Sequence, residues 1–335
     1  MKIASAFAMN GKQRQQILEA APGAQLVDNQ CASNDAVLEL VGGGCDVLLT
    51  FMVPDRLLEV TPGLKWVQLI SAGADHMGKG PAAGGRIRVT TTSGVHAASL
   101  AEFTLAMMLM HAHRLNITSR AQYRHQWLPA PEFMKTADGI RGKTLGIIGY
   151  GSIGRELARI AQSMGMDVLA LKRDPKALRD TGWSPAGVGD PEGRIPRRIV
   201  GPDERAVLMR ESDFIALILP LTPATRGFIG AREIAMMKPG AFIINVGRGG
   251  LIDEQALLSA LEAKRIGGAG LDVFEREPLP ADSPFWDMEE VIMTPHMAGP
   301  FRGYMDLMCE LFAENLRRFI GGKALLNEVD WNLGY

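Results

Sequence analysis

The first hundred residues alternate short apolar runs with stretches in which apolar positions recur every three or four residues. A short apolar run is typical of a buried strand, and the longer period is typical of an amphipathic helix. Strands are predicted in the segments KIASAF, AQLVD, DVLLTF, KWVQLI and RIRVT, and helices in GKQRQQILEAA and NDAVLELV. Strands that alternate with helices indicate βαβ units and a parallel sheet.

A second series of apolar runs begins at Lys143. Strands are predicted in TLGIIG, DVLALKR, FIALILP, AFIINV, GAGLDVF and VIMTPH. The segment FRGYMDLMCELFAENLRRFIGG at the end of the chain is amphipathic, and we expect a helix there that is long enough to pack against the first domain. The pattern therefore predicts an α/β fold with two doubly wound parallel-sheet domains.

Three segments interrupt this alternation. Residues 98–115 predict a long, mostly apolar helix, of the kind that is buried between domains. Residues 116–142 lose periodicity, and we interpret them as an arm that packs on a second subunit of a homodimer, the alternative being a solvated loop. Residues 181–204 are rich in Gly, Pro and charged residues and predict a surface excursion.

Length and charge narrow the classes of function. A chain of 335 residues favours two domains, and 47% apolar residues suffice for a large core. The net charge of −1 supplies no broad attraction for nucleic acid or for an anionic membrane. We therefore expect a small-molecule partner, and neither nucleic acid nor membrane.

The cysteines and the N-terminus indicate a compartment. Cys31, Cys45 and Cys309 are scattered and lack metal-ligand spacing, which is typical of reduced thiols in a cytoplasmic protein, so no metal site is expected. The opening residues MKIASAFAMNGK fit a first strand better than a secretory signal. No uncharged run approaches the roughly 18 residues of a membrane helix.

The segment TLGIIGYGSIGRELARIAQSMGMDVLALKRD carries the spacing G-x-G-x-x-G between a strand and a helix, as a dinucleotide site requires. Gly149 permits the tight turn, Gly151 lets the backbone approach the pyrophosphate, and Gly154 lets helix and strand pack closely. The backbone N–H groups of Ser152 and Ile153 then point at phosphate, at the positive end of the helix dipole. A Rossmann-type nucleotide domain follows.

The end of the next strand indicates which dinucleotide binds. An acidic residue about 20 positions after the first glycine would bind the ribose 2′-hydroxyl of NAD. Here Lys172 and Arg173 occupy that place, and both could pair with a 2′-phosphate. We therefore expect NADP to be preferred, although Asp174 lies close enough to bind a ribose, so NAD remains an alternative.

Charged residues follow three later strands, at the edge where ligands of an open α/β sheet bind. They are Arg248 in NVGRGG, Glu275 and Glu277 in GLDVFEREPLP, and His296 in VIMTPHMAG. Arginine can grip a carboxylate, and a histidine held by a carboxylate can exchange a proton near neutral pH. Together, and after a nucleotide fingerprint, they predict reduction of a carbonyl group in an anionic substrate.

The order of GYGSIG, LPLTPATRG, NVGRGGLIDEQAL, GLDVFEREPLP and TPHMAG resembles that of the D-isomer-specific 2-hydroxyacid dehydrogenases over nearly the whole chain. The resemblance implies a catalytic Arg248, Glu277 (rather than Glu275) and His296. It also implies a flavodoxin-like substrate domain, residues 1–97 and 299–335, into which the nucleotide domain of residues 98–298 is inserted.

Further contacts are implied by the same resemblance. The backbone N–H groups of Ala72 and Gly73, in LISAGADHM, are expected to bind the substrate carboxylate together with Arg248. The expected contacts on the nicotinamide side are Leu219, Pro220, Val246, Gly247, Arg248, Asp272 (towards the carboxamide) and His296, and Thr104 is a further candidate.

The resulting hypothesis is an NADP-preferring reductase of a small 2-oxo acid such as glyoxylate or hydroxypyruvate, which it would convert to the D-2-hydroxy acid. Phe51 and Met52 could instead form an apolar wall for a larger substrate, unless both belong to the domain core. A larger apolar 2-oxo acid is therefore an alternative. The other alternative is a dinucleotide-sensing module that acts as a corepressor.

Overall fold

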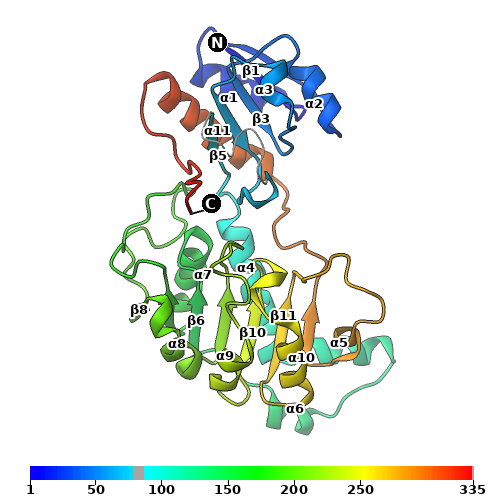
Figure 1. The fold of residues 1–335 in the computed structure, drawn as a ribbon. Helices are drawn as coiled ribbons and strands as arrows, with labels where there is room; N and C mark the ends of the chain where they lie inside the picture. The colour runs from blue at the N-terminus through cyan, green and yellow to red at the C-terminus, as the bar shows by residue number, and fades with distance from the viewer. Residues whose placement is uncertain (78–86, 334–335) are drawn as a thin grey trace. The chain divides into compact units, whose positions relative to one another are not determined.

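The computed structural model describes residues 1–77 and 87–333, which form two compact units (Figure 1). The first unit consists of Met1–His96, Thr181–Ala186 and Phe301–Tyr335, and the second of Ala97–Asp180 and Gly187–Pro300. The second unit is therefore an insertion in the chain of the first.

The first unit contains a parallel sheet of five strands in the order β2-β1-β3-β4-β5. This is the flavodoxin-like order. The strands predicted in this region are all present: β1 (Lys2–Ser5), β2 (Gln25–Asp28), β3 (Val47–Thr50), β4 (Trp66–Leu69) and β5 (Arg88–Thr90). They alternate with the helices α1 (Gly11–Ala20), α2 (Asn34–Val41) and α3 (Leu57–Val60), of which the last was not predicted.

Helices cover both faces of this sheet because successive strand residues point to opposite sides. Leu48 packs with α2 and α3, whereas Val47 and Leu49 pack with α1 and α11 (Tyr304–Ile320). The helix predicted in the last segment of the chain therefore returns to the first unit, and Phe312 of α11 lies against Trp66 with ring centroids 5.2 Å apart.

The second unit contains a parallel sheet of seven strands in the order β12-β11-β10-β9-β6-β7-β8. Read from β8, the first six strands follow the Rossmann order. The strands are β6 (Thr144–Ile148), β7 (Asp167–Leu171), β8 (Arg198–Val200), β9 (Phe214–Leu217), β10 (Phe242–Asn245), β11 (Gly268–Leu271) and β12 (Val291–Met293). The predicted fold of two parallel α/β sheets is confirmed.

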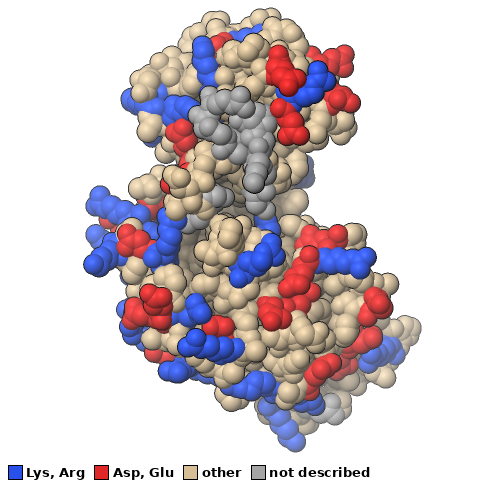
Figure 2. Space-filling view, viewed as in Figure 1, with Lys and Arg blue, Asp and Glu red and all other residues tan. Residues whose placement is uncertain are grey.

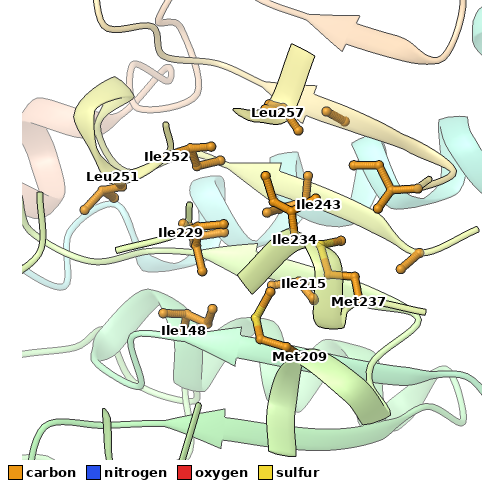
Figure 3. Close-up of a cluster of buried hydrophobic side chains, with 14 of the residues drawn as sticks. Ile148, Met209, Ile215, Ile229, Ile234, Met237, Ile243, Leu251, Ile252 and Leu257 are labelled. Atoms are coloured by element: carbon orange, nitrogen blue, oxygen red, sulfur yellow. The ribbon is translucent and has the colours of Figure 1, made fainter. Parts of the chain in front are cut away.

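Two apolar layers enclose the seven-stranded sheet. Ile148, Ile215 and Ile243 face the helices α8 (Arg205–Glu211), α9 (Ala231–Met236) and α10 (Glu254–Glu262), as Figure 3 shows. Their neighbours Ile147, Ala216 and Ile244 face α4 (Ala97–Ala112) and α7 (Ser152–Ser163) on the other side. Strands buried on both faces explain why the sequence shows continuous apolar runs here rather than alternation.

The region expected to be irregular, 116–142, contains two helices, so this part of the prediction was wrong. They are α5 (Leu115–Tyr123) and α6 (Ala130–Thr136). The chain turns through a left-handed residue, Arg114 (φ 54°), and α5 is then held by tertiary hydrogen bonds. Asn116 Nδ2 donates to Glu289 O (2.6 Å) and Arg120 Nη2 to Met288 O (2.9 Å), contacts that a local pattern does not reveal.

The expected surface excursion, 181–204, is also more structured than predicted. It contains β8, and its first six residues belong to the first unit, where Trp183 N donates to Asn327 Oδ1 (3.2 Å). In the second unit Asp190 is buried and accepts a hydrogen bond from Tyr150 Oη (2.7 Å), while Arg155 Nη1 donates to Asp190 O (2.5 Å). Buried polar partners fasten this segment to α7.

Charges of both signs are interspersed on the face of the molecule shown in Figure 2, in keeping with the net charge of −1. Among the described residues, no helix is long and apolar enough to cross a membrane.

Candidate active site

The strand order of the second unit brings the predicted site residues to one edge of its sheet. All its strands are parallel, so the loops after β6, β7, β9, β10, β11 and β12 leave from the same edge. The strand order reverses between β6 and β9, and ligands of open α/β sheets bind at such a switch point.

The glycines after β6 have the geometry of a pyrophosphate site. Gly149 has φ +111°, and a Cβ there would lie 2.5 Å from Ile218 O. A Cβ at Gly154 would lie 2.3 Å from Gly149 O, so helix and turn touch backbone to backbone. A Cβ at Gly151 would meet no atom within 4 Å, which leaves open space where a phosphate would approach.

The same turn leaves the first N–H groups of α7 available. Gly151 is the N-cap of this 12-residue helix, and it offers no side chain to accept from the N–H groups of Ser152 and Ile153 or the residue after them. Such a helix start binds anions through its N–H groups and its dipole. The residues present therefore fit a dinucleotide.

The expected nicotinamide-side residues after β9 and β10 lie next to each other. A Cβ on Gly247 would lie 3.0 Å from Leu219 O, and both Leu219 and Pro220 are half-buried. Val246 N donates to Leu217 O (3.3 Å), which continues the pairing of the two strands into this loop. Asn245, which the sequence did not single out, shapes the turn because its side chain accepts from Gly247 N and donates to Arg248 O.

The residues expected to choose the dinucleotide follow β7. Lys172 is half-buried and its ammonium donates to Ala177 O, while Arg173 is exposed. Burial, together with the nearby Arg155 guanidinium, lowers the pKa of Lys172. Asp174 is also exposed, and its Oδ1 accepts a hydrogen bond from Lys176 N (2.9 Å) within a local turn.

The structure brings Glu277 and His296 into direct contact. Glu277 Oε2 lies 2.7 Å from His296 Nδ1, and Glu277 Oε1 accepts from Phe274 N (3.0 Å). The carboxylate therefore holds the ring by one nitrogen and leaves Nε2 for another partner. Glu277 makes this contact, as the sequence analysis expected, and Glu275 does not.

Arg248 lies in the same pocket as this pair. The pocket has a volume of about 570 Å³ and is lined by Leu221, Arg226, Gly227, Arg248, Gly249, Gly250, Asp253, Phe274, Glu275, Glu277 and His296. Gly249 allows its two loops to touch, since a Cβ there would lie 1.9 Å from the carbonyl carbon of Phe274. Arg226 and Asp253 were not predicted as site residues, although they lie in LPLTPATRG and NVGRGGLIDEQAL.

Asp272 has a structural role that was not predicted from the sequence. Its side chain is 1% exposed, and its carboxylate accepts from Thr294 Oγ1 (2.7 Å), Met297 N (2.8 Å) and Ala298 N (3.1 Å). His296 N donates to Asp272 O (2.8 Å), and His296 itself has φ 52°. Left-handed backbone is uncommon for a residue with a Cβ, so these bonds impose the turn that presents the imidazole.

A second pocket, of about 640 Å³, adjoins the same pair and is mainly apolar. Its lining residues are Phe274, Glu277, Pro278, Leu279, Trp286, Met293, Thr294, Pro295 and His296. Within the described residues, no group of three or more His, Cys, Asp or Glu side chains could hold a metal ion.

Other expected residues lie in the first unit or are buried. Ala72 and Gly73 follow β4, where Ser71 Oγ donates to Gly73 O (2.8 Å), and their part in substrate binding stays a prediction. Phe51 is 46% exposed and stacks on His76, so it is not a core residue, whereas Met52 packs against the core. Thr104 is buried in α4 with its hydroxyl bonded to Leu100 O, and its contact with a cofactor also stays a prediction.

Comparison with known proteins identifies the family. A model of the NAD-binding domain of the D-isomer specific 2-hydroxyacid dehydrogenases matches residues 105–298. The chain belongs to this family. It is 33% identical to a glyoxylate reductase of Korarchaeum cryptofilum over 93% of this chain and 87% of the relative, and 33% identical to an (S)-sulfolactate dehydrogenase of Chromohalobacter salexigens over 81% and 82%.

A solved member of the family has the same fold. The D-isomer specific 2-hydroxyacid dehydrogenase of Xanthobacter autotrophicus Py2, solved with NADPH and MES, is 29% identical and superposes with a TM-score of 0.78 over 100% of this chain and 99% of that one. The expected activity class, an NAD(P)-dependent oxidoreductase that acts on the CH–OH group of a 2-hydroxy acid, is confirmed.

Proposed function

We propose that this 2-hydroxyacid dehydrogenase reduces a small 2-oxo acid, such as glyoxylate or hydroxypyruvate, to the D-2-hydroxy acid, with NADPH preferred over NADH. The observation that carries the proposal is the contact of 2.7 Å between His296 and Glu277 in the pocket that Arg248 also lines. The similar glyoxylate reductases support the small substrate.

The acid–base step follows from the ring contacts. When the carbonyl is reduced, charge builds on its oxygen, and protonated His296 donates a proton to that oxygen from Nε2. Glu277 stabilises the imidazolium and keeps the ring oriented through Nδ1. In the opposite direction the neutral ring accepts the proton of the hydroxyl group.

Arg248 would bind and orient the substrate. Its planar guanidinium can hold a carboxylate by two parallel hydrogen bonds and polarise the adjacent carbonyl. The glycines on either side of it allow the close packing of the backbone around the pocket. The backbone N–H groups of Ala72 and Gly73 would bind the same carboxylate.

The dinucleotide supplies the hydride when bound. We expect the pyrophosphate at Gly151, Ser152 and Ile153, because the helix start and the open space there suit an anion. The preference for NADPH is supported by the two cations Lys172 and Arg173 after β7, and by the local hydrogen bond that engages Asp174.

A larger apolar 2-oxo acid is the second candidate. It is favoured by the apolar pocket beside His296, in particular by Leu279, Trp286 and Met293, and by the exposed ring of Phe51. Steady-state rates with glyoxylate, hydroxypyruvate, pyruvate and phenylpyruvate, each with NADPH and with NADH, separate the two candidates. Higher kcat/KM for phenylpyruvate than for glyoxylate would favour the second.

The mechanism is tested by removing each group in turn. We expect His296→Asn to lower kcat by at least about 100-fold, because the general acid is lost. Arg248→Ala should lower kcat/KM at least as much, since it removes the carboxylate contact. Both variants should bind NADPH nearly as tightly as the unmodified protein does. The dissociation constant is measured from the change in intrinsic fluorescence as NADPH is added.

The matched control is His113→Asn, an exposed histidine that follows α4 and lies outside both pockets. It should retain full activity. Turnover by both His296→Asn and Arg248→Ala at the control's rate would contradict the mechanism.

We also propose that the protein is a homodimer and that residues 116–142 form the contact. Support comes from three large apolar side chains of this segment that are left exposed: Tyr123, Trp127 and Met134. Aromatic residues and Met are enriched at interfaces between proteins, so their exposure within one segment favours a contact there.

A further inference from the structure

Glu254 contacts the loop that carries Glu277. It is the first residue of α10, directly after the N-cap Asp253. Its Oε1 accepts a hydrogen bond from Glu275 N (2.6 Å), while the adjacent N–H, that of Phe274, donates to Glu277 (3.0 Å). Two carboxylates thus hold two consecutive N–H groups of one loop.

This loop has little room to shift where it passes the 248–254 segment. A Cβ at Gly249 would lie 1.9 Å from the carbonyl carbon of Phe274 and 2.3 Å from Glu275 N. The hydrogen bond from Glu275 N to Glu254 therefore fastens a loop that already touches its neighbour backbone to backbone. A displaced loop would move Glu277, and with it the ring nitrogen that Glu277 holds.

The charge of Glu254 adds to those around the pair. Burial, together with the neighbouring carboxylates of Glu275 and Glu277, raises the pKa of Glu254, so these groups interact. The charged and titratable groups that line the adjoining pocket are Arg226, Arg248, Asp253, Glu275, Glu277 and His296. Glu254 is thus a further acidic group that interacts with Glu277, the residue that holds the imidazole.

We propose that Glu254 is a positioning residue for the acid–base pair: it fixes the loop that carries Glu277, and its charge favours the imidazolium form of His296. The second part rests on the proposed function, in which His296 is the acid. The two parts can be separated, because glutamine keeps the oxygen that accepts from Glu275 N but not the charge, whereas alanine keeps neither.

The test uses Glu254→Gln and Glu254→Ala in the full chain, with Glu262→Gln as control. Glu262 is an exposed residue at the other end of the same helix. The pKa of His296 is measured by NMR titration of the protein with labelled histidine, its signal being assigned by its loss in His296→Asn. The pH dependence of kcat and KM for reduction is measured in parallel.

We expect the NMR titration of His296 to move to lower pH in both Glu254 variants, because a negative charge that acts on Glu277 and the ring it holds is removed. Reduction needs the imidazolium, so the pH above which kcat/KM declines should fall by the same amount. Glu254→Ala should also lose about tenfold in kcat at low pH, since an unheld loop misplaces Glu277, and Glu254→Gln should restore that loss. The control should match the unmodified protein.

An unchanged pKa of His296 in Glu254→Gln would overturn the charge effect, and full kcat in Glu254→Ala would overturn the positioning effect. The NMR titration needs no turnover, so it remains decisive if His296→Asn proves active. An active His296→Asn would refute the proposed mechanism. The coupling between Glu254 and His296 would still be tested by the NMR titration.

Discussion

At the scale of single residues, hydrogen bonds with the side chains of Asp272 and Asn245 fix the backbone of the site. The carboxylate of Asp272 accepts three hydrogen bonds from the loop that carries His296, and the Asn245 amide closes the turn before Arg248. The sequence identified Arg248, Glu277 and His296 because charged residues after buried strands are conspicuous. It could not show what Asp272 binds, since its partners lie more than 20 residues further along the chain.

The choice of dinucleotide is also decided by a few side chains. In a variant with Lys172→Asp and Arg173→Ala, a carboxylate would repel the 2′-phosphate and accept from the ribose hydroxyls of NADH. We expect the ratio of kcat/KM for NADPH to that for NADH to fall by at least about tenfold, which corresponds to the loss of one charge-assisted contact.

The control is Lys176→Asp, a nearby exposed lysine that lies beyond the end of the strand. It should leave the ratio within about twofold, a change that screened surface charges can produce. If the double variant behaves like this control, the cations that recognise the 2′-phosphate lie elsewhere.

At the scale of elements, those with strong local signals were predicted and those held by tertiary contacts were not. The helix α7 was predicted because it follows a glycine fingerprint, which is a local signal. The helix α5 has no comparable signal, because its N-cap Arg114 makes no side-chain capping bond. Contacts with residues 288 and 289 hold it in place instead.

The buried helix α4 carries a histidine that we expect to make the second unit sensitive to acid. His111 is 7% exposed and stacks on Phe242 with ring centroids 4.1 Å apart. Burial, with a smaller effect of Arg114, lowers its pKa to about 4. Below the ordinary value near 6.5 the unfolded chain binds a proton that the folded chain does not, so stability is full above pH 6.5 and declines as the pH falls towards 4.

His111→Phe keeps the ring stacking but has no titrating group. Between pH 6.5 and pH 4 we expect the free energy of unfolding of the unmodified protein to fall by about 3 kcal/mol more than that of His111→Phe. Urea denaturation at a series of pH values measures this difference. His113→Gln, an exposed histidine two residues further on, is the control and should show the pH dependence of the unmodified protein. If His111→Phe shows the same pH dependence as the unmodified protein, folding does not lower the pKa of His111.

At the scale of the whole molecule, the chain passes between its two units four times. Besides the crossings after His96 and Pro300, it leaves the second unit at Thr181 and re-enters it at Gly187. The backbone of Trp183 then lies so close to Gly94 that a Cβ at that glycine would be 1.8 Å from Trp183 O. A composition rich in Gly and Pro predicted only a loop, because composition says nothing about which backbone a loop meets.

The proposed dimer is tested by placing a charge on the exposed segment. Trp127 is 97% exposed, and burying a glutamate in its place against a second subunit would cost several kcal/mol. We expect light scattering to give the mass of two chains for the unmodified protein and the mass of one chain for Trp127→Glu. Leu178→Glu, at an exposed apolar residue outside the segment, should remain dimeric. If the unmodified protein has the mass of one chain, the proposed dimer is refuted.

The sequence by itself determined the parallel α/β class and the dinucleotide fingerprint, and it supplied the three candidate catalytic residues Arg248, Glu277 and His296. These depend on local order: the apolar runs, the glycine spacing, and the position of each charge directly after a strand. Only the tertiary structure decided that Asp272 holds the loop of His296, that Glu254 holds the loop of Glu277, and that Thr181–Ala186 joins the first unit. Such contacts join residues far apart in the chain, and their geometry is set by packing rather than by any local pattern.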